Sequence, residues 1–320
     1  MEFFSSFKMV GSAVLQLVIL GACGFVLVKK NILPEQTLQV LSKILMNLFF
    51  PCFIFNELIN NFKISQFKSF WIYPFFSALI IGVSFVSAYI ALPKKSDFKD
   101  KREFLAAITF SNAGYLPLVL IAALFSGTKA SQLFIYLFLF LLGFNVIIWS
   151  FGVSLLVSNK KNFSNLSQFF SAPVIAILLG LVVAFLKAGV FIPTPIFKSI
   201  NMLGACTLPL AMIVTGANLS LIKIQNIFGN KQLQTVILMK LILVPALAFF
   251  LLLVLKIDPL AKFIFLLQAA MPTAVSLSVI CRTFDLKGEL ANQAIFWTHI
   301  FLIITLPFFL IIFKIIADLA

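Results

Sequence analysis

Acidic residues and histidine are scarce in this sequence. Among its 320 residues there are ten Asp and Glu together and a single histidine, His299. Enzymes that act within membranes need paired carboxylates, metal-binding histidine clusters or an activated serine, and the sequence offers no convincing set of these groups. An intramembrane enzyme is therefore the least favoured class of protein, and no catalytic residue, metal site or cofactor is expected.

Cysteine is equally sparse. Cys23, Cys52, Cys206 and Cys281 lie far apart, in or at the ends of apolar runs, and form no CxxC pair. This distribution favours small buried hydrophobic side chains over disulfides or metal ligands.

Charge of either sign is rare, and apolar residues take its place. Charged residues make up 11% of the chain, 62% of the residues are hydrophobic, 40 are Phe, and the mean hydropathy is +1.13. Soluble domains carry about 25% charged residues, so lipid must be the solvent for much of this surface. The net charge of +14 lies in short gaps between apolar runs. Such a pattern is typical of membrane orientation and provides no basic face for nucleic acid.

Ten apolar stretches are long enough to cross a bilayer, which takes about 20 residues. They are Phe7–Val28, Gln36–Ile59, Phe70–Leu92, Phe104–Phe125, Leu133–Val157, Gln168–Leu186, Ile196–Leu219, Gln232–Leu255, Leu260–Phe284 and Ala291–Ile316. The sequence predicts an all-α membrane protein with ten transmembrane helices.

Lys and Arg are divided unevenly between the two sides of this arrangement. The gaps after the odd-numbered spans hold thirteen of them, and the opposite side with both termini holds nine. Because cytoplasmic loops carry the excess of positive charge, we expect a multi-pass protein of the cell (inner) membrane with both termini extracytoplasmic. Lys43 and Lys240 fall inside spans two and eight. Snorkelling to the interface is the preferred interpretation for both, and a buried functional charge is the alternative.

The two halves of the chain resemble each other in layout. A shift of 158 residues places Pro51 on Pro209, and a shift of 160 residues places spans four and five on spans nine and ten. Five spans per half is an odd number, so the halves must cross the membrane in opposite directions. We expect two inverted five-helix repeats, residues 1–158 and 165–320.

Span four is interrupted about halfway through the bilayer. Ser111 and Asn112 are polar, Gly114 relaxes the chain, and Pro117 lacks a backbone donor. A broken helix is tolerated at that depth only where protein or a water-filled cavity satisfies the freed backbone groups.

Span nine carries Pro272, Thr273 and Ser276 at the same depth, running the other way. Each break taken alone could be an ordinary proline kink, but paired breaks in inverted halves indicate a transporter site. A proline at the first position of a restarted half-helix fits both breaks. Two half-helix N-termini, each with about half a positive charge, would then meet at the midplane, where an anion is the natural ligand.

A combination of short motifs extends over nearly the whole chain. The motifs are Asn47–Pro51, Phe110–Pro117, Leu203–Ala211 with Gly216, Met271–Ala274, and the stretch from Thr298 and His299 to Leu306 and Pro307. Together they resemble the auxin efflux carrier family, in particular its prokaryotic malate-permease-like members.

That resemblance implies a ten-helix inverted repeat like those of bile acid symporters and sodium/proton antiporters. Spans one, two, six and seven would form a scaffold, and spans three to five and eight to ten a moving, elevator-type transport domain. It also implies a malate- or auxin-like carboxylate as substrate, with Asn112 donating hydrogen bonds to it. The sequence departs from the family pattern in two ways. The long loop that many plant carriers place between the halves is absent, and Leu277 stands at the position matching Pro117 in the repeat. The break in span nine is therefore expected nearer Pro272.

The expected function is secondary transport of a small organic anion by alternating access. The candidate substrate site consists of Ser111, Asn112, Gly114, Pro117, Pro272, Thr273 and Ser276. His299 and Asn145 are candidates for coupling or support, with hydrogen-bonded packing as the alternative for both. An anion channel or a membrane sensor is the competing function. The partners considered are the organic anion, the lipid bilayer and a second copy in a homodimer.

Overall fold

The computed structural model describes residues 2–63, 71–92, 98–157 and 170–317. Within these ranges the chain is helical, with no strand and one isolated antiparallel β-bridge between Ser111 and Thr273. The all-α prediction is therefore confirmed for this part of the chain. The polar junction between the two predicted repeats, Ser158–Ser167, lies outside the described residues.

The first half contains α1 and the helices that follow it as far as α8. Their bounds are α1 Glu2–Lys29, α2 Glu35–Ile44, η1 Leu45–Phe49, α3 Phe50–Asn61, α4 Ile72–Ile90, α5 Phe98–Thr109, α6 Tyr115–Leu124, α7 Gly127–Ile147, η3 Ile148–Gly152 and α8 Val153–Leu156. The segments η1 and η3 are π-helical turns inside longer helices, so predicted spans two and five are each one continuous helix.

The second half runs from α9 to α16. Its bounds are α9 Ala172–Phe185, η6 Ala188–Phe191, α10 Thr194–Ala205, α11 Thr207–Ser220, α12 Lys231–Leu238, η7 Met239–Leu243, α13 Val244–Val254, α14 Pro259–Ala269, α15 Ser276–Thr283 and α16 Glu289–Ala317. The π-helical turn η7 joins α12 to α13 without a break.

Seven helical segments among the described residues are long and apolar enough to cross a membrane. They coincide with predicted spans one, two, three, five, seven, eight and ten. Three shorter apolar helices, α6, α9 and α14, lie within predicted spans four, six and nine. Spans four and nine fall short because each is interrupted near its middle, as the sequence predicted.

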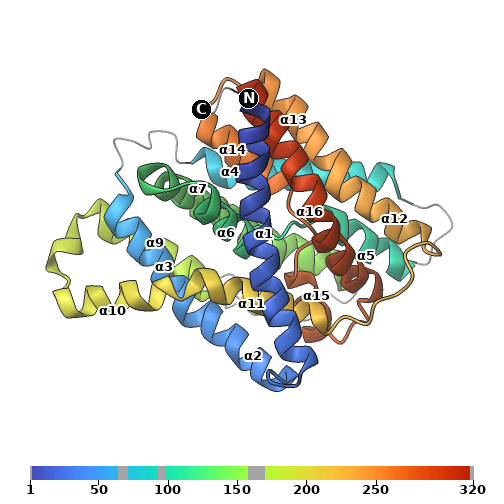
Figure 1. Cartoon of the computed structure of the whole chain (residues 1–320), viewed down its shortest axis with the longest axis horizontal. Coiled ribbons are helices and arrows are strands. Elements are labelled where there is room, and N and C mark those ends of the chain that lie inside the picture. Colours follow the sequence, from blue (N-terminus) through green and yellow to red (C-terminus); the bar gives the residue numbers. More distant parts are fainter. Residues whose placement is uncertain (1, 64–70, 93–97, 158–169, 318–320) are drawn as a thin grey trace.

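Helix α1 crosses the centre of the view in Figure 1, in front of the other helices, and packs closely along α11. Glycines make this approach possible, because a Cβ atom at Gly24 would overlap the backbone carbonyl of Ile213 and one at Gly216 would overlap that of Gly21. Close backbone contact at small residues is how helices associate where lipid removes the hydrophobic drive between them.

Elements from both halves lie on each side of α1 (Figure 1). On one side α3 packs against α9 and α10, and on the other α16 packs against α5, α12 and η7. Helix α7 is buried along most of its length and contacts α3, α4, α6 and α14. A helix that is apolar all round belongs in the interior, and α7 packs against α6 and α14, one half of each broken helix.

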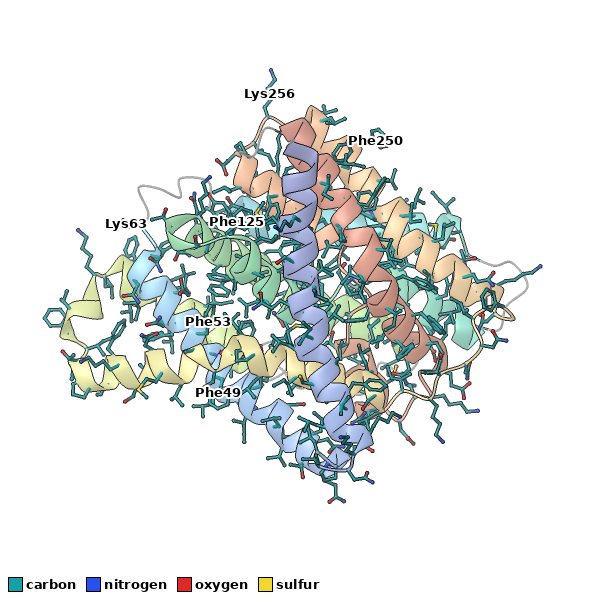
Figure 2. The ribbon with its side chains drawn as sticks, in the orientation of Figure 1. Phe49, Phe53, Lys63, Phe125, Phe250 and Lys256 are labelled. Atoms are coloured by element: carbon teal, nitrogen blue, oxygen red, sulfur yellow. The ribbon has the colours of Figure 1, made fainter. Side chains whose placement is uncertain are left out.

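Apolar side chains cover the outside of the molecule (Figure 2). Phe250 on α13 is 64% exposed, and Phe185 and Phe191 in the second half are also exposed. Lys63 and Lys256 lie just beyond the ends of α3 and α13. Aromatic flanks with lysines at the helix ends suit a surface that faces lipid between two polar layers.

Candidate functional site

The two interrupted helices cross each other at their breaks. Residues 110–114 separate α5 from α6, and residues 270–275 separate α14 from α15. The segments run antiparallel: Asn112 N donates to the carbonyl of Pro272 at 2.8 Å, and Ala274 N donates to that of Phe110 at 2.9 Å. These bonds satisfy backbone groups that the breaks remove from the helices, which is a requirement at membrane depth. We call these two segments the crossover.

The prolines do not occupy the positions that the sequence suggested. Pro117 is the third residue of α6, and Pro272 lies inside the second non-helical segment, four residues before α15 begins at Ser276. The expectation of proline at the first position of each restarted helix was therefore wrong. Pro117 loses no hydrogen bond, because N–H groups in the first turn have no helical acceptor. Pro272 instead offers its carbonyl to Asn112.

Gly114 is the N-cap residue of α6 and adjoins open space. Its backbone angles are φ −99° and ψ −83°, and a Cβ atom at this position would meet no other atom within 4 Å. The start of α6 therefore has room beside it for an atom that is not part of the protein.

The carbonyl end of α5 is capped by side chains from other elements. Lys240 in η7 donates from Nζ to the carbonyl of Ile108 and to Ser111 Oγ, both at 2.8 Å. Thr273 donates from Oγ1 to the carbonyl of Ala107 at 2.9 Å. Cations and donors are favoured here because the last carbonyls of a helix carry partial negative charge.

The snorkelling interpretation is wrong for Lys240. Its side chain is 0% exposed and its amine points to the crossover, because the last turn of α5 supplies acceptors where η7 packs against it. Lys43 in α2 is exposed, as snorkelling requires.

Two adjacent residues of α16 each hold one segment of the crossover. Thr298 Oγ1 accepts from Thr273 N at 3.1 Å and donates to the carbonyl of Ala294 at 2.6 Å. His299 Nε2 lies 3.1 Å from Asn112 Nδ2, and His299 Nδ1 lies 2.7 Å from the carbonyl of Ile295.

The partners of His299 define its tautomer. A carbonyl can only accept, so Nδ1 carries the proton, and Nε2 accepts from the Asn112 amide. The imidazole at the crossover is thus neutral, with both nitrogens bonded.

Gln268 at the end of α14 completes the contacts between the two halves. Its Nε2 donates to the carbonyl of Ala113 at 3.1 Å, while its Oε1 is buried with no hydrogen-bond partner in the structure. Lys240, Gln268 and Thr298 were not among the candidate site residues. Each is a polar residue within a long apolar stretch, and that signal could have identified them.

The other candidates are placed as follows. Ser111, Asn112, Pro272 and Thr273 meet in the crossover, with Asn112 8% exposed. Ser276 is the first residue of α15, with part of its side chain exposed. Asn145 donates to the carbonyl of Leu141 in its own helix at 2.8 Å and has no polar contact with the crossover.

The electrostatics of the crossover are uneven. Neither α6, with N-cap Gly114, nor α15, with N-cap Val275, has a side chain hydrogen-bonded to its first turn. In the part of the chain that the structure describes, no carboxylate forms a hydrogen bond or ion pair with residues 110–114 or 270–275. The negative end of α5 is thus capped by Lys240 and Thr273, while the positive ends of α6 and α15 have no side-chain partner.

A buried, charge-poor crossover of two broken helices inside a helical, lipid-facing protein defines a multi-pass membrane transport protein. Comparison with known proteins is more specific. The profile of the family described as "Membrane transport protein" matches residues 9–310, and the chain belongs to this family, the auxin efflux carrier family.

Three relatives illustrate the similarity. An uncharacterized transporter of Methanocaldococcus jannaschii is 28% identical over 285 residues, 85% of this chain and 88% of the relative. An uncharacterized transporter of Saccharomyces cerevisiae is 32% identical over 117 residues, 36% of this chain and 27% of the relative. Protein PIN-LIKES 2 of Arabidopsis thaliana is 29% identical over 155 residues, 44% of this chain and 34% of the relative. The match therefore spans about a quarter of the yeast protein, about a third of the plant protein and most of the archaeal one.

Proposed function

We propose that this chain is a secondary carrier that moves a small organic anion, a malate- or auxin-like carboxylate, across the cell membrane by alternating access. The substrate binds at the crossover of α5–α6 with α14–α15. The observation that carries this proposal is the uneven capping described above, in which the protein neutralises the negative end of α5 and leaves two positive helix ends open.

The chemistry of the crossover favours a negative ligand over a cation. A helix N-terminus offers unpaired N–H groups and about half a positive charge. Lys240 adds a buried amine beside Ser111, and no carboxylate among the described residues is hydrogen-bonded or ion-paired with the two segments. A cation at this place would have few negative partners and a nearby amine to repel it.

The same proposal includes the arrangement in the membrane. Ten crossing segments form two inverted repeats, residues 1–158 and 165–320, with both termini outside. The positions of the helix ends support the repeat: α5 ends at Thr109 and α14 at Ala269, which is the 160-residue shift seen in the sequence. The contacts of α1 with α11, and of α3 with α9 and α10, support a scaffold built from spans one, two, six and seven. The remaining spans then move as an elevator-type transport domain.

A binding screen tests the substrate class. Purified protein is titrated with mono- and dicarboxylates and, as matched controls, with the corresponding neutral amides. We expect carboxylates alone to raise the melting temperature, since a ligand that binds the folded state stabilises it by RT ln(1 + [L]/Kd). Equal stabilisation by the neutral amides would contradict an anion site.

An anion channel is the competing function, and flux separates the two. In liposomes a carrier shows saturable uptake that speeds up when substrate is present on the far side, because the loaded site returns faster than the empty one. Flux that rises linearly with concentration and shows no exchange would instead favour the channel.

A further inference from the structure

The hydrogen bond between Asn112 and His299 leaves the substrate side of Asn112 with the wrong polarity for an anion. One N–H of the Asn112 amide is given to His299 Nε2. The Oδ1 atom forms no hydrogen bond with the described residues and is not one of the fully buried polar atoms, although Asn112 as a whole is only 8% exposed. In this arrangement the side chain presents an accessible carbonyl oxygen, which repels a carboxylate.

We propose that His299 is the proton site of this carrier, and that a proton on its Nε2 reverses the Asn112 amide so that proton and anion bind together. This inference rests on the proposed function, because it concerns the same anion site.

Hydrogen-bond complementarity enforces the reversal. Nδ1 donates to the carbonyl of Ile295 and keeps its proton in both states. In the neutral imidazole Nε2 can only accept, so it faces the Asn112 NH2 group. When a proton binds to Nε2, both nitrogens are donors, and Nε2–H needs an acceptor. A half-turn of the Asn112 side chain about Cβ–Cγ, a broad and roughly two-fold torsion, supplies Oδ1 as that acceptor.

The half-turn changes what the anion meets. The Asn112 NH2 group now points away from His299 and can donate to a carboxylate, and the imidazolium adds a positive charge behind it. No covalent bond is broken: one proton is added to Nε2, and one hydrogen bond between Asn112 and His299 is exchanged for another. Thr298 continues to hold the second segment through Thr273 N, so the crossover keeps its shape.

Among the described ionisable side chains near α16, His299 is the one that is hydrogen-bonded to Asn112. The described ionisable side chains on elements that pack against α16 are Lys8, Cys23 and Lys29 on α1, Lys101, Arg102 and Glu103 on α5, Lys231 on α12, Lys240 on η7, Lys262 on α14, and Cys281 and Arg282 on α15. None of them has a hydrogen bond or ion pair with His299.

Two of these groups, Glu103 and Lys240, are hydrogen-bonded to residues close to His299 or Asn112 in the sequence. Glu103 accepts from Ala291 N, eight residues before His299, which is about 12 Å along a helix. Lys240 bonds Ser111, the neighbour of Asn112, and it is the rival site for the proton.

Linkage makes the inference measurable. If the free carrier holds His299 neutral and the loaded carrier holds it protonated, each anion takes up one proton. The affinity then rises about tenfold for each unit that the pH falls, and the anion favours proton binding by the same factor.

The experiment uses the full chain in lipid nanodiscs. Malate and indole-3-acetate are titrated at about pH 6.5 and about pH 8, where free carboxylates with a pKa of about 4 stay ionised. Calorimetry in two buffers of different ionisation enthalpy gives the affinity and the number of protons taken up per anion. We expect the affinity of the unmodified protein to be higher at the lower pH by roughly thirtyfold at the limit of full linkage, with close to one proton taken up.

Three variants assign the proton. His299→Gln keeps an amide that can either donate to Asn112 or accept from it but cannot gain a proton, so the affinity should be the same at both pH values with no uptake. Thr305→Val should keep the pH dependence, because Thr305 lies on the same helix and its hydroxyl donates only to the carbonyl of Phe301. Lys240→Met should bind more weakly and still take up one proton.

Each contrary outcome has a distinct meaning. Binding by the unmodified protein with equal affinity at both pH values and no proton uptake overturns the coupling and leaves the anion site intact. Uptake that persists in His299→Gln and disappears in Lys240→Met assigns the proton to Lys240 and overturns the role of His299. If neither carboxylate binds at either pH, the anion site fails and the coupling fails with it. The result for the unmodified protein decides the coupling even if His299→Gln does not fold.

Discussion

Removing the Asn112 amide is the most direct perturbation of the crossover. Asn112→Ala deletes the donor proposed for the substrate carboxylate and leaves the backbone bond from Asn112 N to Pro272 O in place. A hydrogen bond to a charged group is worth about 1.5–3 kcal/mol. Since about 1.4 kcal/mol corresponds to a factor of ten, the affinity for a carboxylate should fall by roughly ten- to a hundredfold.

The structure also predicts a cost to stability that the sequence did not suggest. An amide facing a wet cavity would contribute little to folding, but Asn112 is 8% exposed and donates to His299 Nε2. Without it a buried acceptor loses its partner, which typically costs about 1–3 kcal/mol. The variant should therefore melt at a lower temperature and still be folded.

Asn145→Ala is the matched control, because it makes the same chemical change at an amide that bonds only its own helix at Leu141. Affinity from calorimetry and melting temperature in detergent are measured for both variants, followed by flux in liposomes. A folded Asn112→Ala protein whose affinity for the substrate is unchanged would refute the proposal that the substrate binds at the crossover. A similar loss of affinity in Asn145→Ala would show that the effect is not specific to the crossover.

Three further predictions follow from the packing. Lys240→Met should lower both the substrate affinity and the melting temperature, because Ile108 O and Ser111 Oγ each lose a buried donor, at a cost of about 1–3 kcal/mol each. The control Lys43→Met, at an exposed position, should change stability by less than about 0.5 kcal/mol. Equal effects of the two substitutions would argue against the capping role of Lys240. Gly216→Leu should prevent α1 from packing on α11, since even a Cβ atom overlaps the Gly21 carbonyl, and a monodisperse protein of unchanged melting temperature would contradict this close contact. In a background without the four native cysteines, a cysteine at Lys256 should react with an impermeant reagent in intact cells and one at Lys287 only after permeabilisation; the opposite pattern would invert the topology drawn from the charge count.

Local sequence patterns were enough to locate the spanning segments and the breaks in two of them. Hydropathy marks each span without reference to any other, because a segment surrounded by lipid must be apolar along its own length. Gly114, Pro117 and Pro272 weaken the helix locally, so the interruptions in spans four and nine could also be located, although the positions of the prolines relative to the new helix starts could not. That the two breaks lie near each other followed in outline from the repeat, but the pairing of Ser111 with Thr273 came from the structure.

The distant side chains that bond to the crossover could be identified only from the way the helices pack. Whether Lys240 snorkels or is buried depends on which neighbouring helix its face of η7 packs against. Its partner Ser111 lies 129 positions away in the sequence, so no local pattern indicates the contact. The bond between Asn112 and His299 joins residues 187 positions apart, and it depends on α16 lying against the broken helices. Such contacts are set by the packing of whole helices and not by local propensity, which is why the site residues supplied by η7, α14 and α16 became visible only in three dimensions.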